Sequence, residues 1–360
     1  MVVAPSYLSH GLVNLAAEIE SRLIGSAPNP MLDPAIGELI PDGRTYVLVL
    51  FDGLGVAQLD HQAAGSLRAS HAATLEAPFP TTTSVSLATL ATGLSPARHG
   101  LVAHLTWLED LDRVVNTLKW VDLSGNPVSH DYATFLEGPN LWERLRRGGV
   151  EPVTVQPDAF SGSPLSRLLY RGARFEGCWD DHDLVDATVQ LASGPARFIF
   201  TYVWQVDFAG HVSGLDSAEF TAAMRLAANI WDELASRLPP DATLIGTADH
   251  GLIGYDETEK ILVRDEKFDS LRFAGDTRGV HLWGERSLFQ DLAGLTGGEL
   301  IDPLDLLGAD PSPATKRRVG QSLLLAPEGK VILPPGFDKR LASYHGGLAP
   351  EEREIPLLIA

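Results

Sequence analysis

Short apolar runs of the strand type alternate with amphipathic segments along most of this chain. The runs that most resemble strands are Thr45–Asp52, Val150–Gln156, Arg197–Asp207 and Ala242–Asp249. Helices are expected near the N-terminus and over Thr83–Thr92, Asn140–Arg147 and Ser217–Leu238. This alternation favours a parallel sheet covered by helices on both faces, which is a three-layer α/β/α fold.

Three of these predicted strands end on an aspartate. They are Asp52, Asp207 and Asp249. In open α/β sheets, ligands bind beyond the carboxyl ends of the strands. Three carboxylates gathered at that edge repel one another and stay ionised together when cations lie between them. The alternative for each aspartate taken singly is that it starts a turn or caps a helix, which is the commonest role after a strand.

Histidines stand close to two of the aspartates. His211 follows Asp207 by four residues, a spacing that places both side chains on one face of a helix. His250 follows Asp249 directly, and the next residue is a glycine that permits the backbone to turn. Near the C-terminus, His345 precedes two glycines. A ligand set of carboxylates and imidazoles without sulfur suits zinc, with manganese or iron as alternatives.

A cluster of threonines precedes a helix of small residues in FPTTTSVSLATLATGLSPARHG, residues 79–100. The last threonine of the cluster, Thr83, stands at the expected start of that helix. A bound metal lowers the pKa of a hydroxyl, and a helix N-terminus favours negative charge at the same place. Thr83 is therefore a candidate nucleophile and a candidate metal ligand. The alternative is that it only caps the helix.

The charge balance restricts the partners. The 360 residues carry a formal net charge of −19, which argues against a nucleic-acid polymer or an anionic membrane surface. A small phosphorylated substrate remains possible if metal ions receive it. The single cysteine, Cys178, excludes an internal disulfide and a cysteine-based zinc site. The N-terminal segment lacks the basic start of a signal peptide, and no apolar run has the length of a membrane helix, so we expect a cytoplasmic protein.

Five motifs together resemble a known family. FDGLG, FPTTTSVSLATLATGLSPARHG, DFAGHVSGLDS, TADHG and YHGG occur in this order. They are similar to the motifs of the alkaline phosphatase superfamily, and specifically of its type I phosphodiesterase/nucleotide pyrophosphatase branch. The resemblance extends from about Thr45 to Pro356. It implies one alkaline-phosphatase-like domain over residues 1–360, with a small cap inserted over residues 254–344.

The resemblance also implies a site with two zinc ions and a phosphothreonine intermediate formed on Thr83. One ion is then held by Asp207, His211 and His345. The other is then held by Asp52, Asp249, His250 and the hydroxyl of Thr83. The implied enzyme is a hydrolase that cleaves phosphodiester or pyrophosphate bonds in nucleotide-like substrates.

The chain departs from the family pattern at several places. His104 stands where relatives carry an asparagine that donates to a phosphate oxygen, and it either keeps that role or is structural. Ser84 follows the nucleophile where a phenylalanine is frequent. Tyr202 matches a tyrosine that stacks on the base of nucleotides, but in its apolar run it could equally be a core residue. Trp107 and Trp120 either line a substrate pocket or belong to a small flap.

Alternative functions fit the sequence less closely than this one. A phosphomonoesterase of the same superfamily is the main alternative. A phosphomutase would use a serine nucleophile and a basic pocket, and no basic cluster is present. A sulfatase would need a modified cysteine or serine in a motif that the surroundings of Cys178, EGCWDD, do not match. A non-catalytic metal-binding protein would have no reason to keep a nucleophile together with every ligand.

Overall fold

A seven-stranded sheet forms the centre of the larger part of the molecule. The computed structural model describes residues 3–129, 135–136, 138–195 and 197–360. In spatial order the strands are β2 (His71–Glu76), β18 (Glu354–Ile359), β9 (Ala242–Thr247), β1 (Thr45–Phe51), β8 (Phe198–Val203), β6 (Pro152–Pro157) and β7 (Arg174–Cys178). The five strands from β9 to β7 are parallel, and β18 runs antiparallel to both of its neighbours. The mostly parallel sheet predicted from the sequence is confirmed.

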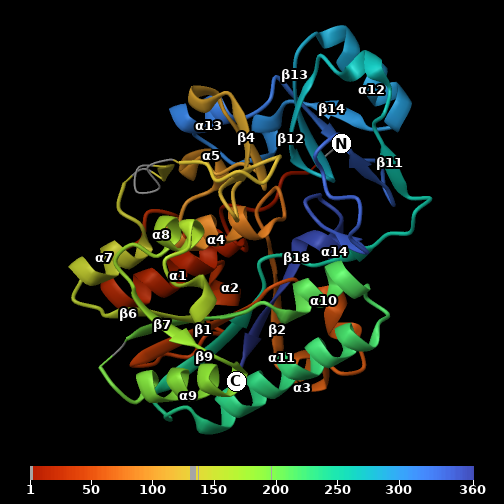
Figure 1. Ribbon diagram of the computed structural model, residues 1–360. Coiled ribbons are helices and arrows are strands. Elements are labelled where there is room, and N and C mark those ends of the chain that lie inside the picture. Colours follow the sequence, from red (N-terminus) through yellow and green to blue (C-terminus); the bar gives the residue numbers. More distant parts are fainter. Residues whose placement is uncertain (1–2, 130–134, 137, 196) are drawn as a thin grey trace.

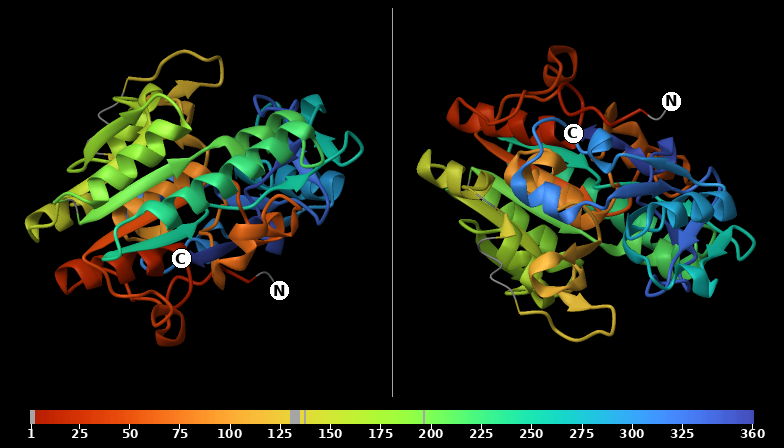
Figure 2. Two further views of the ribbon diagram at one scale, coloured as in Figure 1. Left: turned by 90° about the horizontal axis from the view of Figure 1, so that it is seen from below. Right: turned by 90° about the horizontal axis from the view of Figure 1, so that it is seen from above.

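Helices cover both faces of this sheet (Figure 1). On one face lie α3 (Gly65–Ala69), α9 (Asp181–Ala192), α10 (Gln205–Ser213) and α11 (Ala218–Arg237). On the other face lie α1 (Leu12–Ile24), α4 (Thr83–Thr92), α7 (Leu141–Arg147) and α8 (Pro164–Leu169). Figure 1 shows the three layers stacked one above the other, and Figure 2 views the molecule from below and from above. Among the described helices, none has the length and apolar character needed to cross a membrane.

The predicted helices agree closely with the observed ones, but one strand end was predicted wrongly. Helix α4 begins at Thr83 and ends at Thr92, as expected. Strand β8 ends at Val203, so Asp207 does not end a strand but lies in the first turn of α10. The apolar run FIFTYVWQV continues across the junction between strand and helix, and hydrophobicity alone therefore did not mark where the strand stops.

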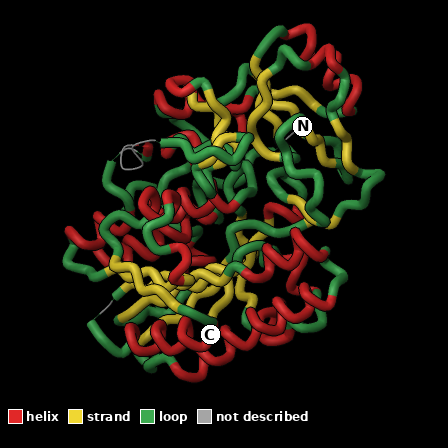
Figure 3. Tube along the Cα trace, in the orientation of Figure 1, coloured by secondary structure: helices red, strands yellow, loops and turns green. Residues whose placement is uncertain are grey.

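A second seven-stranded sheet lies beside the first, where Figure 3 shows a separate group of strands. Its strands in spatial order are β14 (Glu299–Ile301), β15 (Ser322–Leu325), β13 (Gly279–Trp283), β12 (Arg272–Asp276), β3 (Leu105–Leu108), β4 (Arg113–Asn116) and β5 (Val121–Asp122). Within the described residues, all neighbouring strands of this sheet pair antiparallel. Residues 105–122 thus join residues 272–325 in this sheet, a contribution from outside the predicted 254–344 cap.

Short elements complete the fold around the second sheet and its junction with the first. Two strand pairs are β10 (Ile253–Gly254) with β17 (Ser343–Tyr344) and β11 (Lys260–Leu262) with β16 (Val331–Leu333). The remaining helices are α2 (Pro34–Gly37), α5 (Pro96–His99), α12 (Arg286–Thr296), α13 (Pro313–Arg318) and α14 (Pro350–Arg353). The 3₁₀ turns are η1 (Val56–Asp60), η2 (Glu109–Leu111), η3 (Asp158–Phe160), η4 (Glu266–Phe268) and η5 (Pro303–Leu306).

A buried ion pair joins the two sheets. Arg278, between β12 and β13, donates from Nε to Oε1 of Glu352 in α14 at 2.9 Å, and both side chains are buried. Arg278 also donates to the carbonyl oxygens of Pro327 and Lys330. Because β18 of the first sheet follows α14 directly, this pair fixes the second sheet to the chain that leads into the first.

Asp276, at the end of β12, contacts the two segments that contain His104 and Gly346. Its Oδ2 accepts the backbone N–H of His104 at 3.2 Å. Gly346 has a φ of +111° and lies so close that a Cβ there would be 2.6 Å from the Cβ of Asp276. Burial raises the pKa of Asp276 to about 7. The second sheet therefore supports the two loops that carry His104 and His345.

We expect Glu352→Ala to lower the free energy of unfolding by about 3–5 kcal/mol, because it leaves the guanidinium of Arg278 buried without its carboxylate. Asp291→Ala is the control, since it removes a half-exposed partner of Lys267 at 3.6 Å, and such pairs contribute about 1 kcal/mol or less. Urea unfolding followed by circular dichroism measures both. Equal, small effects of the two substitutions would contradict the role given to the buried pair.

We expect Asp276→Asn to change how stability depends on pH. The pKa of Asp276 is raised from 3.8 to about 7 in the folded protein by burial, so between these values the folded state binds a proton that the unfolded chain releases. The contribution of the carboxyl to stability therefore declines as the pH rises through about 7. The free energy of unfolding of the variant should increase relative to wild type between about pH 5 and pH 8, with chelator present in both. A difference in the free energy of unfolding between variant and wild type that stays constant with pH would contradict this prediction.

Candidate active site

The three aspartates gather at the carboxyl ends of neighbouring parallel strands. Asp52 follows β1 directly, Asp249 lies two residues beyond β9, and Asp207 follows β8 through the start of α10. The backbone N–H of Asp207 donates to the carbonyl of Asp52 at 3.0 Å. The N–H of Gly53 donates to Oδ1 of Asp249, also at 3.0 Å. The order β9-β1-β8 in the sheet thus brings together carboxylates that lie up to 197 residues apart in the sequence.

The three histidines share one mode of anchoring. In each imidazole Nδ1 lies within hydrogen-bond distance of a backbone carbonyl oxygen: 2.7 Å for His211 to Ser343, 2.7 Å for His345 to Thr81, and 3.2 Å for His250 to Gly251. A carbonyl oxygen can only accept, so Nδ1 is the donor. Each neutral imidazole therefore presents the lone pair of Nε2 to the site, as metal-binding histidines do.

These lone pairs face carboxylate oxygens. Nε2 of His211 lies 3.2 Å from Oδ1 of Asp207, and Nε2 of His250 lies 3.3 Å from Oδ2 of Asp249 and 3.6 Å from Oδ1 of Asp52. The same three carboxylate oxygens are buried and have no hydrogen-bond donor within the described part of the chain. Buried acceptors that face other acceptors are costly unless a cation lies between them. The donor set therefore fits metal ions.

Burial and the charges of neighbouring side chains shift several pKa values in the site. Burial and the neighbouring carboxylates of Asp249 and Asp207 raise the pKa of Asp52 well above its usual value. Burial also raises the pKa of Asp207, but the imidazoles of His211, His250 and His345 together outweigh this and hold that pKa below its usual value. The pKa of His345 is lowered by burial and by the other two imidazoles. Bound cations would favour the ionised carboxylates and the neutral imidazoles together.

Two groups of candidate ligands share one histidine. In each group the ligand atoms lie within 4.8 Å of one another. The groups are Asp207, His250 and His345, and Asp52, Asp249 and His250. The ring of His250 stacks on that of His345 with centroids 3.8 Å apart, and the ring of His211 lies 5.1 Å from that of His345. All six predicted aspartate and histidine ligands are thus neighbours, with His250 at the centre of the cluster.

Thr83 stands at the edge of this cluster. It is the first residue of α4, it is buried, and its Oγ1 lies 3.2 Å from Nε2 of His250. Ser86, one turn later, donates its hydroxyl to the carbonyl of Asp249 at 2.7 Å and ties α4 to the turn that holds Asp249. Thr81 donates its hydroxyl to the carbonyl of Gly347 at 3.1 Å. The cluster of threonines is therefore connected to two of the loops that carry ligands.

The two predicted substrate-binding residues lie beside the cluster but in different surroundings. Nε2 of His104 is 3.1 Å from Nδ2 of Asn116. Burial, together with the nearby His211 and Lys119, lowers the pKa of His104 to about 4. Tyr202 lies in β8 with 8% of its surface exposed, and its hydroxyl donates to Oδ2 of Asp52. The contact between Tyr202 and Asp52 was not foreseen, because it depends on the pairing of β1 with β8.

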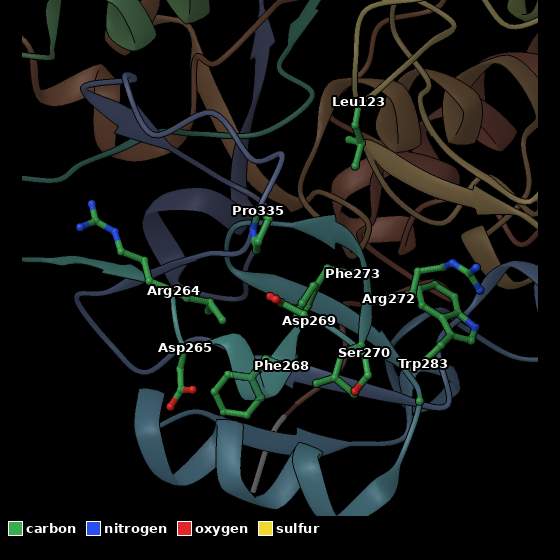
Figure 4. A pocket seen from close by; sticks show the side chains of 13 residues that line it. Leu123, Arg264, Asp265, Phe268, Asp269, Ser270, Arg272, Phe273, Trp283 and Pro335 are labelled. Carbon is green, nitrogen blue, oxygen red and sulfur yellow. The ribbon is translucent and has the colours of Figure 1, made fainter.

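Trp107 lies in β3 of the second sheet, and Trp120 lies in the turn between β4 and β5. Trp120 is buried against Phe135. Trp107 packs edge-on against Trp283 and lies under the guanidinium of Arg272, which is 4.3 Å from the ring centroid. Trp283 and Arg272 line a cavity of about 620 Å³ in this part of the molecule, which Figure 4 shows in close-up. The lining residues include neither Thr83 nor any of the candidate metal ligands.

An exposed apolar stripe on α10 was missed from the sequence. Phe208 and Val212 are 55% and 60% exposed, and Phe208 packs edge-on against Trp204 with centroids 5.3 Å apart. Residues four apart share a helix face, so this stripe runs directly beside the one formed by Asp207 and His211. The spacing was present in WQVDFAGHV, but the assignment of a strand up to Asp207 concealed it.

Comparisons with known proteins agree with this geometry. The family model for type I phosphodiesterase/nucleotide pyrophosphatase matches residues 46–283. Human ectonucleotide pyrophosphatase/phosphodiesterase 5 superposes with a TM-score of 0.67 at 18% identity, over 88% of this chain and 87% of that one. The murine protein gives 0.66 at 18% identity, over 87% of both chains. Phosphonoacetate hydrolase from Sinorhizobium meliloti 1021, in complex with phosphonoacetate, gives 0.64 at 17%, over 89% and 91%.

A comparison with curated protein sequences finds no match. At identities below one fifth, the solved structures establish the fold, which is that of the alkaline phosphatase superfamily. The family model covers well over half of the chain and includes four of the five motifs, up to TADHG. The chain therefore belongs to the type I phosphodiesterase/nucleotide pyrophosphatase family, as its motifs indicated.

Proposed function

We propose that this protein hydrolyses a phosphodiester or pyrophosphate bond in a small, nucleotide-like substrate, with two zinc ions and through a phosphothreonine at Thr83. Hydrolysis of phosphoric esters is the activity that the family supports. One observation supports the proposed metal ions and the proposed phosphothreonine. The hydroxyl of Thr83 stands at the N-terminus of a ten-residue helix, 3.2 Å from Nε2 of His250, beside three buried carboxylate oxygens without donors among the described residues.

We assign the ligands to the two ions as the family resemblance implies. One ion would be held by Asp207, His211 and His345. The other would be held by Asp52, Asp249, His250 and the hydroxyl of Thr83. Bound zinc supplies the positive charge that lowers the pKa of a coordinated hydroxyl and offsets charge on the phosphoryl oxygens. Oxygen and nitrogen donors without sulfur favour zinc, with manganese or iron as alternatives.

Two displacements at phosphorus follow from this arrangement. The hydroxyl of Thr83 loses its proton to solvent and its Oγ1 attacks phosphorus, while the bond from phosphorus to the leaving oxygen breaks. Water then attacks the phosphothreonine, the bond from phosphorus to Oγ1 breaks, and Thr83 regains a proton. The positive end of the α4 dipole stabilises negative charge on Oγ1 in both steps.

The charge around the site favours a diester over a monoester. A monoester dianion needs more positive charge at its oxygens than a diester monoanion does, and arginine commonly supplies it. Here His104 has a pKa lowered to about 4 and is neutral at ordinary pH. The stripe of Trp204, Phe208 and Val212 offers an apolar surface beside Asp207 for an organic substituent. A nucleotide-like substrate is supported by the murine relative, solved as an inactive variant in complex with AMP.

Thr83→Ala should lower kcat on the order of a thousandfold, because it deletes the covalent route, and should leave about two zinc ions per chain, because six of the seven proposed ligands remain. Thr92→Ala is the matched control in the same helix, since that hydroxyl bonds only to local backbone groups. Elemental analysis and steady-state kinetics measure both effects. A rapid-quench experiment should trap phosphothreonine in wild type only. Near wild-type turnover by Thr83→Ala would show that Thr83 is not the nucleophile.

The zinc-loaded protein should have a higher kcat/KM for bis-p-nitrophenyl phosphate than for p-nitrophenyl phosphate across about pH 6 to 9, since His104 brings no added charge in that range. Chelation should abolish both activities, and zinc should restore them. A higher kcat/KM for the monoester throughout would identify a phosphomonoesterase and reject the diesterase proposal.

A further inference from the structure

We propose that Asn116 fixes His104 in the tautomer protonated at Nδ1, so that Nδ1–H donates a hydrogen bond to a phosphoryl oxygen of the substrate. Asn116 is then a positioning residue that acts through His104. The donor role rests on the proposed phosphoryl transfer, whereas the tautomer depends only on the hydrogen bonds described next.

The orientation of the Asn116 amide follows from the turn after β4. Its Oδ1 accepts the backbone N–H groups of Leu118 at 3.0 Å and Lys119 at 3.1 Å. If the amide were reversed, its NH₂ group would face these two donors and neither N–H would have an acceptor there. The carbonyl end of the amide therefore faces the turn, and the NH₂ end faces His104.

The amide orientation determines the state of the imidazole. Nδ2 of Asn116 lies 3.1 Å from Nε2 of His104. An amide NH₂ group can only donate, so Nε2 must accept. In a neutral imidazole the proton is then on Nδ1. The two backbone donors at Leu118 and Lys119 thus select the tautomer of a ring that they do not touch.

The surroundings keep this imidazole neutral. Burial lowers the pKa of His104 to about 4, His211 and Lys119 lower it further, and Asp207 opposes them. Asp276 accepts a hydrogen bond from the backbone N–H of His104, and within the described residues none joins it to the ring. Within the described residues, Nδ1 of His104 has no hydrogen-bond partner. The imidazole of His104 therefore offers an uncharged Nδ1–H donor that no described group accepts.

A donor of this kind suits a phosphodiester. His104 can act as such a donor only in the Nδ1–H tautomer, because in the other tautomer Nδ1 would present a lone pair to a negatively charged oxygen. Asn116 would thus determine whether His104 can donate.

Asn116→Asp tests the proposal. The carboxylate can still accept from Leu118 and Lys119, so the turn is kept, but its second oxygen now requires a proton on Nε2 of His104. Long-range ¹H–¹⁵N spectra of zinc-loaded protein, with the His104 signal assigned through His104→Asn, should show Nδ1–H in wild type and Nε2–H in the variant at about pH 9, above ordinary histidine titration.

Kinetics give the second readout, with bis-p-nitrophenyl phosphate as substrate. At about pH 9 the kcat/KM of Asn116→Asp should fall on the order of a hundredfold below wild type, the scale of losing one donor to the transition state. In the His104→Asn background, Asn116→Asp should have little effect, since the asparagine donates by itself.

Asn229→Asp, the same chemical change on an exposed position of α11, controls for added charge and should match wild type. A wild-type ring protonated at Nε2 would overturn the tautomer. An equal loss in the His104→Asn background would overturn the donor role. Zinc-loaded wild type with no phosphoesterase activity would instead reject the proposed function and the donor role with it, while the spectra still report on the tautomer.

Discussion

Mutual repulsion among buried acceptors is the constraint on which this structure depends. Oδ1 of Asp52, Oδ1 of Asp207 and Oδ2 of Asp249 are buried without donors in the described chain, and imidazole nitrogens face them. Such an arrangement is unfavourable unless cations compensate it. The parallel strands hold the carboxylates together, and the backbone carbonyls hold the imidazoles against them. The site therefore strongly favours the binding of positive charge.

The second sheet stabilises this arrangement from the other side. Asp276 contacts the loops that carry His104 and His345, and the buried pair of Arg278 and Glu352 joins the sheet to the segment that enters β18. The two sheets therefore cannot move apart without disturbing the site. His104 itself lies just before β3. The second sheet therefore supports both a loop with a candidate metal ligand and the proposed donor to the substrate.

Much of the site could be predicted because its residues lie in short motifs next to recognisable strand and helix ends. Asp52 and Asp249 follow apolar runs, and Thr83 begins a helix whose bounds agree with the prediction. The start of α10 was missed because its apolar run hides the junction. The contact of Tyr202 with Asp52 depends on the pairing of Leu50 with Tyr202, and the bond between Asn116 and His104 depends on the pairing of Leu105 with Asn116. No local pattern encodes such pairings.

The anchoring of the histidines by main-chain oxygens has a consequence for tolerance to mutation. Ser343 and Thr81 orient His211 and His345 through their carbonyl groups, and every amino acid carries a carbonyl. The orientation of these two imidazoles therefore depends on the path of the backbone and not on the identity of the residues beside them. The side chain of Ser343 can be exchanged without loss of this hydrogen bond as long as the backbone keeps its path. A small shift of the loop would turn the imidazole of His211 away from the site even though no candidate ligand had been replaced.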